Sequence, residues 1–219
     1  MAAPGPAQSV AARMPDSADR NAEEESRNPW TVRTAETRYS NPWISVVHHE
    51  VTTPAGTPGI YGVVRYRNHA VGVVPVEADG TTWIVGQWRF PLGRYSWEIP
   101  EGGAPDGSDP LETGRRELLE ETGLSARHWR ELMRMDLSNS VSDESATLYL
   151  CWDLSAGTAT PEETERLRLR RLPLGEAVAM ALDGRITDAM SVAALLKLRL
   201  LLETGGLPED LAARARLGL

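Results

Sequence analysis

The segment from Pro100 to Gly123 constrains the fold of this chain more than any other part of the sequence. Three glycines and two prolines occupy residues 100–107, a composition that predicts a loop without regular structure. Asp109 can cap a helix that begins at the next residue, and Glu112 is placed to complete a capping box. Gly123 supplies the left-handed residue that commonly ends a helix. The chain is therefore expected to run from a glycine-rich loop straight into a well-capped helix.

Short β-branched and apolar segments, separated by turn residues, flank this loop and helix. Two runs on either side of the turn at 53–56 predict one hairpin, and two runs around the turn at 77–80 predict a second. A lone hairpin is only marginally stable, so the first must pack against the rest of the chain or against a partner chain. The predicted strands are 44–51, 60–66, 70–76, 82–88, 95–99, 146–152 and 166–172, and the later predicted helices are 174–183 and 188–203.

The charge of the chain limits its partners. Lys and Arg total 23 against 31 Asp and Glu, which gives a formal net charge of −8 at pH 7. This balance does not suit a protein that follows nucleic-acid phosphates, so no nucleic-acid partner is expected. An acidic protein that handles an anionic substrate needs a bound cation to invert the local field. The only lysine, Lys197, is followed by leucine, so the chain has no P-loop motif.

Nothing in the sequence points to export or to membrane insertion. Residues 1–27 are rich in Ala, Pro, Ser and charge without a hydrophobic stretch, and they are expected to form a disordered tail. No apolar run approaches the roughly 18 residues that a membrane-spanning helix needs. Cys151 is the single cysteine, which excludes an intramolecular disulfide and a cysteine zinc cage. We therefore expect a cytoplasmic protein with no membrane partner.

Three glutamates gather on one side of the predicted helix. Glu117 and Glu121 are four residues apart, which places them one turn apart on the same face, with Glu120 beside them. Arg116, four residues before Glu120, can offset part of the repulsion between them. Converging carboxylates are what a hard divalent cation prefers, and carbonyls of the glycine-rich loop can fold back to the same point. A solvated acidic face is the alternative interpretation.

The spacing of these residues resembles that of a known family. Gly102 and the run Arg116-Glu117-Leu118-x-Glu120-Glu121-x-Gly123-Leu124 resemble the box of the Nudix hydrolases, G-x5-E-x7-R-E-U-x-E-E-x-G-U. One position departs from it, because Ser108 stands where the box has its first glutamate. This departure bears on the number of metal ions and on the rate more than on the fold. Residues 87–91 and 97–102 also resemble segments of ADP-ribose and sugar-nucleotide pyrophosphatases.

This resemblance implies an α+β chain. Its main part would be a Nudix fold, an α/β/α sandwich with a mixed β-sheet, preceded by a small N-terminal antiparallel β layer. The implied organisation is a tail over 1–27, the β layer over 28–68, a Nudix hydrolase domain over 69–205 and a C-terminal tail over 206–219. The β layer would serve dimerisation and base binding, so a homodimer is expected.

The resemblance also implies a metal site. Its ligands fall on Glu117 and Glu121, with Glu120 nearby and Glu101 contributing its carbonyl from the loop. The expected cofactor is Mg²⁺, with Mn²⁺ as the alternative.

Catalytic roles follow from the same resemblance. Glu144, in the polar loop 138–144, is expected to accept a proton from an attacking water or to orient it, with Asp143 as the alternative. Arg116 and Glu120 of the box are counted with the catalytic residues. Asn139 stands where ADP-ribose enzymes usually carry proline, which leaves room for other nucleoside diphosphate sugars.

Four residues are expected to bind the substrate. Arg89 falls where an arginine grips the phosphates and Glu98 where a glutamate lines the same pocket; a surface salt bridge is the alternative for Arg89. Trp43 and Tyr61 fall where the family places aromatic residues that stack on the base, and core or interface packing is their alternative. The four histidines and the single cysteine are expected to be structural.

The implied activity is the Mg²⁺-dependent hydrolysis of the pyrophosphate bond of a nucleoside diphosphate sugar. ADP-ribose, split to AMP and ribose 5-phosphate, is the expected substrate. The alternatives are a Nudix domain that binds a nucleotide without catalysis and a house-cleaning nucleoside triphosphatase.

Overall fold

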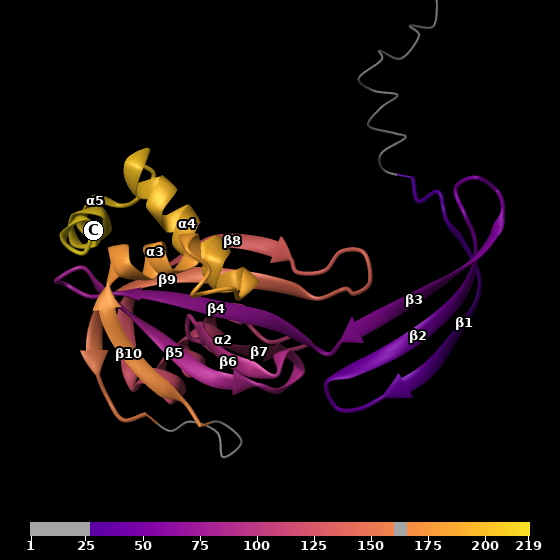
Figure 1. Ribbon diagram of the computed structural model, residues 1–219, viewed down its shortest axis with the longest axis horizontal. Helices are drawn as coiled ribbons and strands as arrows, with labels where there is room; N and C mark the ends of the chain where they lie inside the picture. Colours follow the sequence, from indigo (N-terminus) through magenta and orange to yellow (C-terminus); the bar gives the residue numbers. More distant parts are fainter. Residues whose placement is uncertain (1–26, 160–165) are drawn as a thin grey trace, which may run out of the picture. The chain divides into compact units, whose positions relative to one another are not determined.

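The computed structural model describes residues 27–159 and 166–219 (Figure 1). All but one residue of the tail expected over 1–27 lies outside the described residues. Contacts divide the chain into two compact units. The smaller contains His48–Tyr61 and the described part of Met1–Glu36, and the larger contains Thr37–Val47 and Gly62–Leu219.

The N-terminal part of the chain forms a three-stranded sheet in the order β1-β2-β3. Its strands are β1 (Thr31–Ser40), β2 (Ile44–Thr52) and β3 (Pro58–Tyr66), and short connections of this kind join antiparallel neighbours. The Asn41 side chain accepts hydrogen bonds from the backbone N–H groups of Trp43 and Ile44, at 2.9 and 2.8 Å, and so fixes the first turn. The hairpin 44–66 is as expected, whereas β1 was not predicted.

The larger unit is built on a seven-stranded mixed sheet. Its main path runs β10-β5-β4-β9-β8, with β6 paired to β5 and β7 paired to β4. The central pair β4–β9 is parallel, with Ala70 opposite Ala146, and the other pairs are antiparallel. The strands are β4 (Asn68–Val76), β5 (Thr81–Arg89), β6 (Arg94–Glu98), β7 (Glu101–Pro105), β8 (Leu124–Asp136), β9 (Ser145–Ala156) and β10 (Arg168–Pro173); a 3-10 turn, η1 (Phe90–Leu92), joins β5 to β6.

Helices cover both faces of this sheet. One face carries α2 (Pro110–Thr122), and the other carries α3 (Leu174–Leu182), α4 (Ala189–Glu203) and α5 (Glu209–Leu217) (Figure 1). The expected α/β/α sandwich with a mixed sheet, accompanied by a small N-terminal sheet, is confirmed.

Alternate residues of β4 and β9 build a separate core on each face of the sheet. Val74 and Leu150 belong to the larger core with α3, α4 and α5. Val73 and Cys151 pack instead with Leu118 of α2. Because α2 is held by this second core, its position relative to the sheet is fixed.

The predicted N-cap residue and terminating glycine of α2 are confirmed, whereas the Glu112 side chain pairs with Arg115 instead of completing the predicted capping box. The Asp109 side chain accepts a hydrogen bond from Leu111 N at 2.9 Å, and Gly123 ends the helix with φ of 72°. Glu112 bonds to Arg115 at 2.7 Å, one turn further along the helix. The α2 termini therefore lie where the sequence predicts them.

Two expectations about segments are wrong. Residues 101–105 were expected in a loop without regular structure, but they form β7, antiparallel to β4, because the inner edge of β4 needs a hydrogen-bonding partner. Residues 206–219 were expected to be a tail, but they contain α5, whose Leu211, Ala212 and Ala215 are buried in the larger core. Among the described residues, no helix is long and apolar enough to cross a membrane.

Candidate functional site

Seven of the ten site residues that the sequence singles out line one large cavity in the larger unit, whereas Glu120, Glu121 and Tyr61 do not line it. Its volume is about 700 Å³, and its walls come from the ends of β3, β5, β6 and β7, from α2, from the loop before β9 and from the first turn of α4. The lining residues are Trp43, Tyr66, Asn68, Ala70, Arg89, Pro91, Leu92, Ser96, Glu98, Glu101, Gly102, Gly103, Arg116, Glu117, Leu137, Glu144, Thr187, Asp188, Ala189 and Met190.

Helix α2 carries two buried glutamates, of which Glu117 lines this cavity. Glu117 and Glu121 are 8 % and 2 % exposed, which is exceptional for a charged side chain. The Glu121 carboxylate accepts a hydrogen bond from the backbone N–H of Glu101 at 3.0 Å, and this bond ties the helix to the start of β7. The alternative of a solvated acidic face therefore does not hold for these two residues.

Arg116 pairs with two of the box glutamates. Its guanidinium donates to Glu117 at 2.5 Å and to Glu120 at 2.7 Å. The expected offset between Arg116 and Glu120 is present. Among the described residues, no three Asp, Glu, His or Cys side chains are gathered closely enough to enclose a metal ion.

Gly102 leaves room for the Glu117 carboxylate. A Cβ atom added at Gly102 would lie 2.0 Å from Glu117 Oε1 and 2.1 Å from its carboxyl carbon. No side chain fits at this position without displacing Glu117. The glycine of the box motif therefore allows β7 to pass directly against the helix glutamate.

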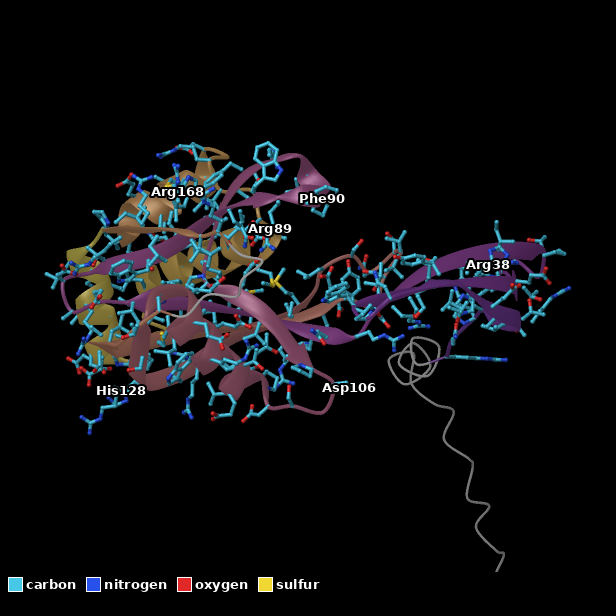
Figure 2. All side chains as sticks on the ribbon, turned by 90° about the horizontal axis from the view of Figure 1, so that it is seen from below. Arg38, Arg89, Phe90, Asp106, His128 and Arg168 are labelled. Carbon is cyan, nitrogen blue, oxygen red and sulfur yellow. The ribbon has the colours of Figure 1, made fainter. Side chains whose placement is uncertain are left out.

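Arg89 is held in place by two acids of the same cavity. Its Nε donates to both carboxylate oxygens of Glu98 at 3.0 Å, and its Nη2 donates to Glu98 and to Glu101, each at 2.6 Å. Glu98 is only 2 % exposed. Figure 2 shows Arg89 towards the centre of the unit, while Phe90, 90 % exposed, lies at the outer tip of the β5–β6 connection. Arg89 and Glu98 thus share a cavity wall, and two buried carboxylates fix the guanidinium.

Glu101 is a buried acid with only one of its two carboxylate oxygens hydrogen-bonded. Burial raises the pKa of its carboxyl well above the ordinary value, and the negative charges of Asp188 and Glu98 raise it further. Its Oε1 accepts from Arg89, whereas its buried Oε2 has no hydrogen-bond partner among the described residues. Such a group is costly to leave charged unless a cation or a proton compensates it.

Glu144 lies at the end of a loop that is fixed to the end of β3. Asp143 accepts from the Tyr66 N–H at 2.8 Å and from the Arg65 guanidinium at 3.1 Å, and its own N–H donates to Val64 O. The Tyr66 hydroxyl is hydrogen-bonded to the Glu144 carboxylate. Burial raises the pKa of Glu144, and this hydrogen bond from Tyr66 opposes the rise.

The cavity holds more negative than positive charge. Five acids line it, Glu98, Glu101, Glu117, Glu144 and Asp188, against two arginines. The oxygen-rich donor set and the unsatisfied Glu101 Oε2 fit a hard divalent cation. A phosphate-bearing substrate can approach these acids once a cation compensates them.

Sequence reasoning missed two residues of this site. Asp188 caps α4, where its carboxylate accepts from Ser191 N at 2.7 Å, and its charge acts on both Glu101 and Glu144. A polar residue just before an apolar helix was the available signal for Asp188. Tyr66 had no comparable signal, because its partner Glu144 is remote in sequence.

The two expected base-stacking residues lie in different units. Trp43, 67 % exposed, lines the cavity of the larger unit. Tyr61 belongs to the smaller unit, where it packs edge-on against Trp30 with ring centroids 5.4 Å apart.

Residues expected to be structural have partners or are buried. His69 Nδ1 bonds to the Ser145 hydroxyl and Nε2 to the Thr147 hydroxyl, at 2.8 and 2.7 Å. Cys151 is fully buried, and burial raises the pKa of its thiol well above the ordinary value, which suits an unreactive thiol.

Comparison with known proteins agrees with this geometry. The family described as NUDIX domain matches residues 66–195, and the family described as nucleoside diphosphate sugar hydrolase N-terminal domain matches residues 30–64. An ADP-ribose pyrophosphatase from Mycobacterium tuberculosis is 31 % identical over 74 % of this chain and 79 % of its own length. A methanol dehydrogenase activator from Bacillus methanolicus is 32 % identical over 78 % and 92 %.

A solved structure shows the same fold. The crystal structure of an ADP compounds hydrolase superimposes with a TM-score of 0.74 at 22 % identity, over 83 % of this chain and 98 % of that one. The match to the NUDIX domain covers the sheet from β4 to β10, the box helix α2 and the first turns of α4. The chain therefore belongs to the Nudix hydrolase family.

Proposed function

We propose that this protein hydrolyses the pyrophosphate bond of a nucleoside diphosphate sugar, and that ADP-ribose, split to AMP and ribose 5-phosphate, is its main substrate. The observation that carries the proposal is the cavity in which five acids face two arginines beside the box helix. The phosphates of a diphosphate and the carboxylates of the cavity are both negative, so the substrate can bind here only when a cation compensates them. The ADP-ribose pyrophosphatases among the relatives support the choice of substrate.

Glu117, Glu120 and Glu121, together with the backbone carbonyl of Glu101, would hold Mg²⁺, with Mn²⁺ as the alternative. The buried Glu101 Oε2, which has no hydrogen-bond partner among the described residues, is an oxygen that a cation could compensate. When bound, the cation supplies the charge that neutralises the diphosphate oxygens.

Arg89 would bind a phosphate oxygen. Glu98 and Glu101 occupy its Nε and Nη2, so Nη1 is the nitrogen that makes neither of these bonds. Because two buried carboxylates already orient the guanidinium, little side-chain entropy is lost when a phosphate binds. Arg116 supplies a second positive charge on the same wall.

Glu144 would act as the general base. It accepts the proton of the attacking water as the new P–O bond forms and the bridging P–O bond breaks, and the bridging oxygen leaves with the other phosphate. The raised pKa of Glu144 makes it a better proton acceptor than an ordinary carboxylate.

The proposal extends to the assembly and to the location of the protein. We propose a homodimer, in which Trp43 and Tyr61 are the residues that stack on the base. The match of residues 30–64 to a nucleoside diphosphate sugar hydrolase N-terminal domain supports a role of this segment in the site. A chain with one buried cysteine suits the cytoplasm.

The Glu121→Gln variant tests the proposed function. The amide keeps an oxygen that can accept from Glu101 N but removes the negative charge. We expect Mg²⁺-dependent hydrolysis of ADP-ribose to fall at least a hundredfold, while the thermal midpoint changes by no more than a few degrees. The products are measured by chromatography with and without Mg²⁺.

Glu112→Gln is the matched control. Glu112 lies on the same helix, is exposed and does not line the cavity, so its variant keeps full activity. Full activity of Glu121→Gln, or hydrolysis without any divalent cation, contradicts the proposal. Activity against nucleoside triphosphates but not against ADP-ribose, GDP-mannose or UDP-glucose favours the house-cleaning alternative.

A further inference from the structure

A second cavity lies beside the candidate active site, and Tyr66 and Asn68 line both. This side cavity has a volume of about 430 Å³ and belongs entirely to the larger unit. Its other walls come from β2, the end of β3, the loop before α2 and the loop before β9. The lining residues are Ser45, Arg65, Tyr66, Arg67, Asn68, His69, Ala104, Pro105, Asp106, Gly107, Ser108, Asp143 and Ser145.

Hydrogen bonds organise the wall between the two cavities. Asp143 holds the Tyr66 backbone through Oδ1 and the Arg65 guanidinium through Oδ2. Val64 N donates to Val141 O at 2.8 Å, so the loop before β9 is anchored by backbone bonds as well. A wall fixed in this way keeps its shape before any ligand arrives, which lowers the entropic cost of binding.

The charges of the side cavity balance. Two arginines, Arg65 and Arg67, and two aspartates, Asp106 and Asp143, line it, and Figure 2 shows Asp106 on the loop between β7 and α2. His69 also lines the side cavity, and both its ring nitrogens are bonded to hydroxyls. Its imidazole is neutral at pH 7, because burial and the nearby Arg134 charge lower its pKa. The net charge of these groups is therefore zero, in contrast to the acidic main cavity.

A balanced cavity of this kind selects against ions and favours a neutral polar ligand. A free phosphate would meet two carboxylates, and a cation would meet two guanidinium groups. The lining offers donors from Arg65, Arg67 and Asn68, acceptors from the aspartates, and serine hydroxyls that do both. A molecule with several hydroxyl groups matches this mixture, since each hydroxyl both donates and accepts.

We propose that the side cavity binds the sugar that a nucleoside diphosphate sugar carries beyond its diphosphate. This inference rests on the proposed function, which places the diphosphate in the adjacent main cavity. Tyr66 and Asn68, on the shared wall, contact the substrate where the diphosphate meets the sugar. The side cavity is then the part of the protein that distinguishes one nucleoside diphosphate sugar from another.

Filling the side cavity tests this proposal. Ser45 lines the side cavity and not the main one, so Ser45→Trp occupies sugar space without touching the diphosphate. The two substrates compared are ADP-ribose and the methyl ester of ADP, which keeps the diphosphate but lacks the second sugar. We expect Ser45→Trp to lower kcat/KM at least tenfold for ADP-ribose, mainly through KM, and less than twofold for methyl-ADP.

Two further variants guard against a folding defect. Ser125→Trp, the matched control, places the same bulk on an exposed serine that lines neither cavity and changes kcat/KM less than twofold on either substrate. Asp106→Ala removes an acceptor from an exposed loop and lowers kcat/KM three- to tenfold on ADP-ribose alone.

Each outcome decides the question. Equal losses of kcat/KM on both substrates overturn the sugar subsite, and so does an unchanged kcat/KM in either Ser45→Trp or Asp106→Ala. In both cases the proposed function stands as long as the wild-type protein hydrolyses ADP-ribose. Equal kcat/KM of the wild-type protein on ADP-ribose and methyl-ADP also overturns it. A wild-type protein that hydrolyses neither compound refutes the proposed function, and this inference with it.

Discussion

Burial raises the pKa of the proposed general base Glu144, and the Tyr66 hydroxyl opposes this rise. A base works only when deprotonated, so activity falls as the pH drops through the pKa of Glu144. The Tyr66 hydroxyl donates a hydrogen bond that stabilises the Glu144 carboxylate, and this bond opposes the rise in pKa that burial causes. In Tyr66→Phe that stabilisation is lost, and the pKa of Glu144 rises further. We expect the acidic limb of the kcat/KM profile to move to higher pH, because the carboxylate loses a hydrogen bond that stabilises its charged form.

Tyr95→Phe is the control for this variant, because Tyr95 does not line the cavity. Its profile should coincide with that of the wild type. An acidic limb of Tyr66→Phe that stays in place or moves to lower pH contradicts the role given to Glu144.

Individual site residues differ in how far the sequence could reveal them. The shared face of Glu117 and Glu121 follows from helical spacing alone, and both prove to be buried together. The bonds from Arg89 to Glu98 and Glu101 depend on how β5, β6 and β7 meet, and no local pattern encodes that meeting. The resemblance placed these residues in one pocket, whereas only the structure shows that the two acids hold the arginine.

Helix α2 is the element on which the metal ligands depend, and its first turn is stabilised by Asp109. Asp109→Ala removes the acceptor for Leu111 N and should cost about 1 kcal/mol of stability. A loss of this size lowers the thermal midpoint by about 2–4 °C in a domain of this length. Calorimetry measures the change, with Asp106→Ala as the control from the same connection. A shift as large in Asp106→Ala would show that the connection, and not the cap, stabilises the helix.

Strand β7 shows why an element can escape sequence reasoning. Glycine and proline are poor strand formers, so residues 101–105 favour a loop by composition. The strand forms because β4 lies between β9 and β7 at this level and offers its backbone groups to both. Glycine is also required there, since Gly102 must let the Glu117 carboxylate approach. The tertiary requirement overrides the local preference.

At the scale of the whole molecule, α5 is part of the fold. Leu211 is fully buried in the larger core, whereas Leu217 on the same helix is 71 % exposed. Leu211→Ala should lower the free energy of unfolding by about 2–5 kcal/mol, and Leu217→Ala should change it by less than about 0.5 kcal/mol. Chemical denaturation of the two variants measures both. Equal stability of the two would mean that α5 does not dock on the core.

The packing of α5 against the core depends on residues that are distant in the sequence, so it could not be predicted from the sequence. The only large apolar side chains of α5 are Leu211 and Leu217, so the sequence of this segment alone does not predict a packed helix. The helix is held by distant partners: Trp152 Nε1 donates to Asp210 at 2.6 Å, and Gly175 N donates to Gly218 O at 2.7 Å. The mixed sheet and its cover of helices on both faces followed from the family resemblance, but these contacts of α5 did not.

The parallel pairing of β4 with β9 has a consequence for synthesis on the ribosome. Ala70 pairs with Ala146, so the central strand pair cannot form until the ribosome has synthesised residues 71–146. At translation speeds of roughly 5–20 residues per second, the wait lasts about 4–15 seconds. During that interval the backbone N–H and C=O groups on one edge of β4 are unpaired and open to other nascent chains. The growing polypeptide is then a natural client for chaperones, and slow codons before β9 would prolong its exposure.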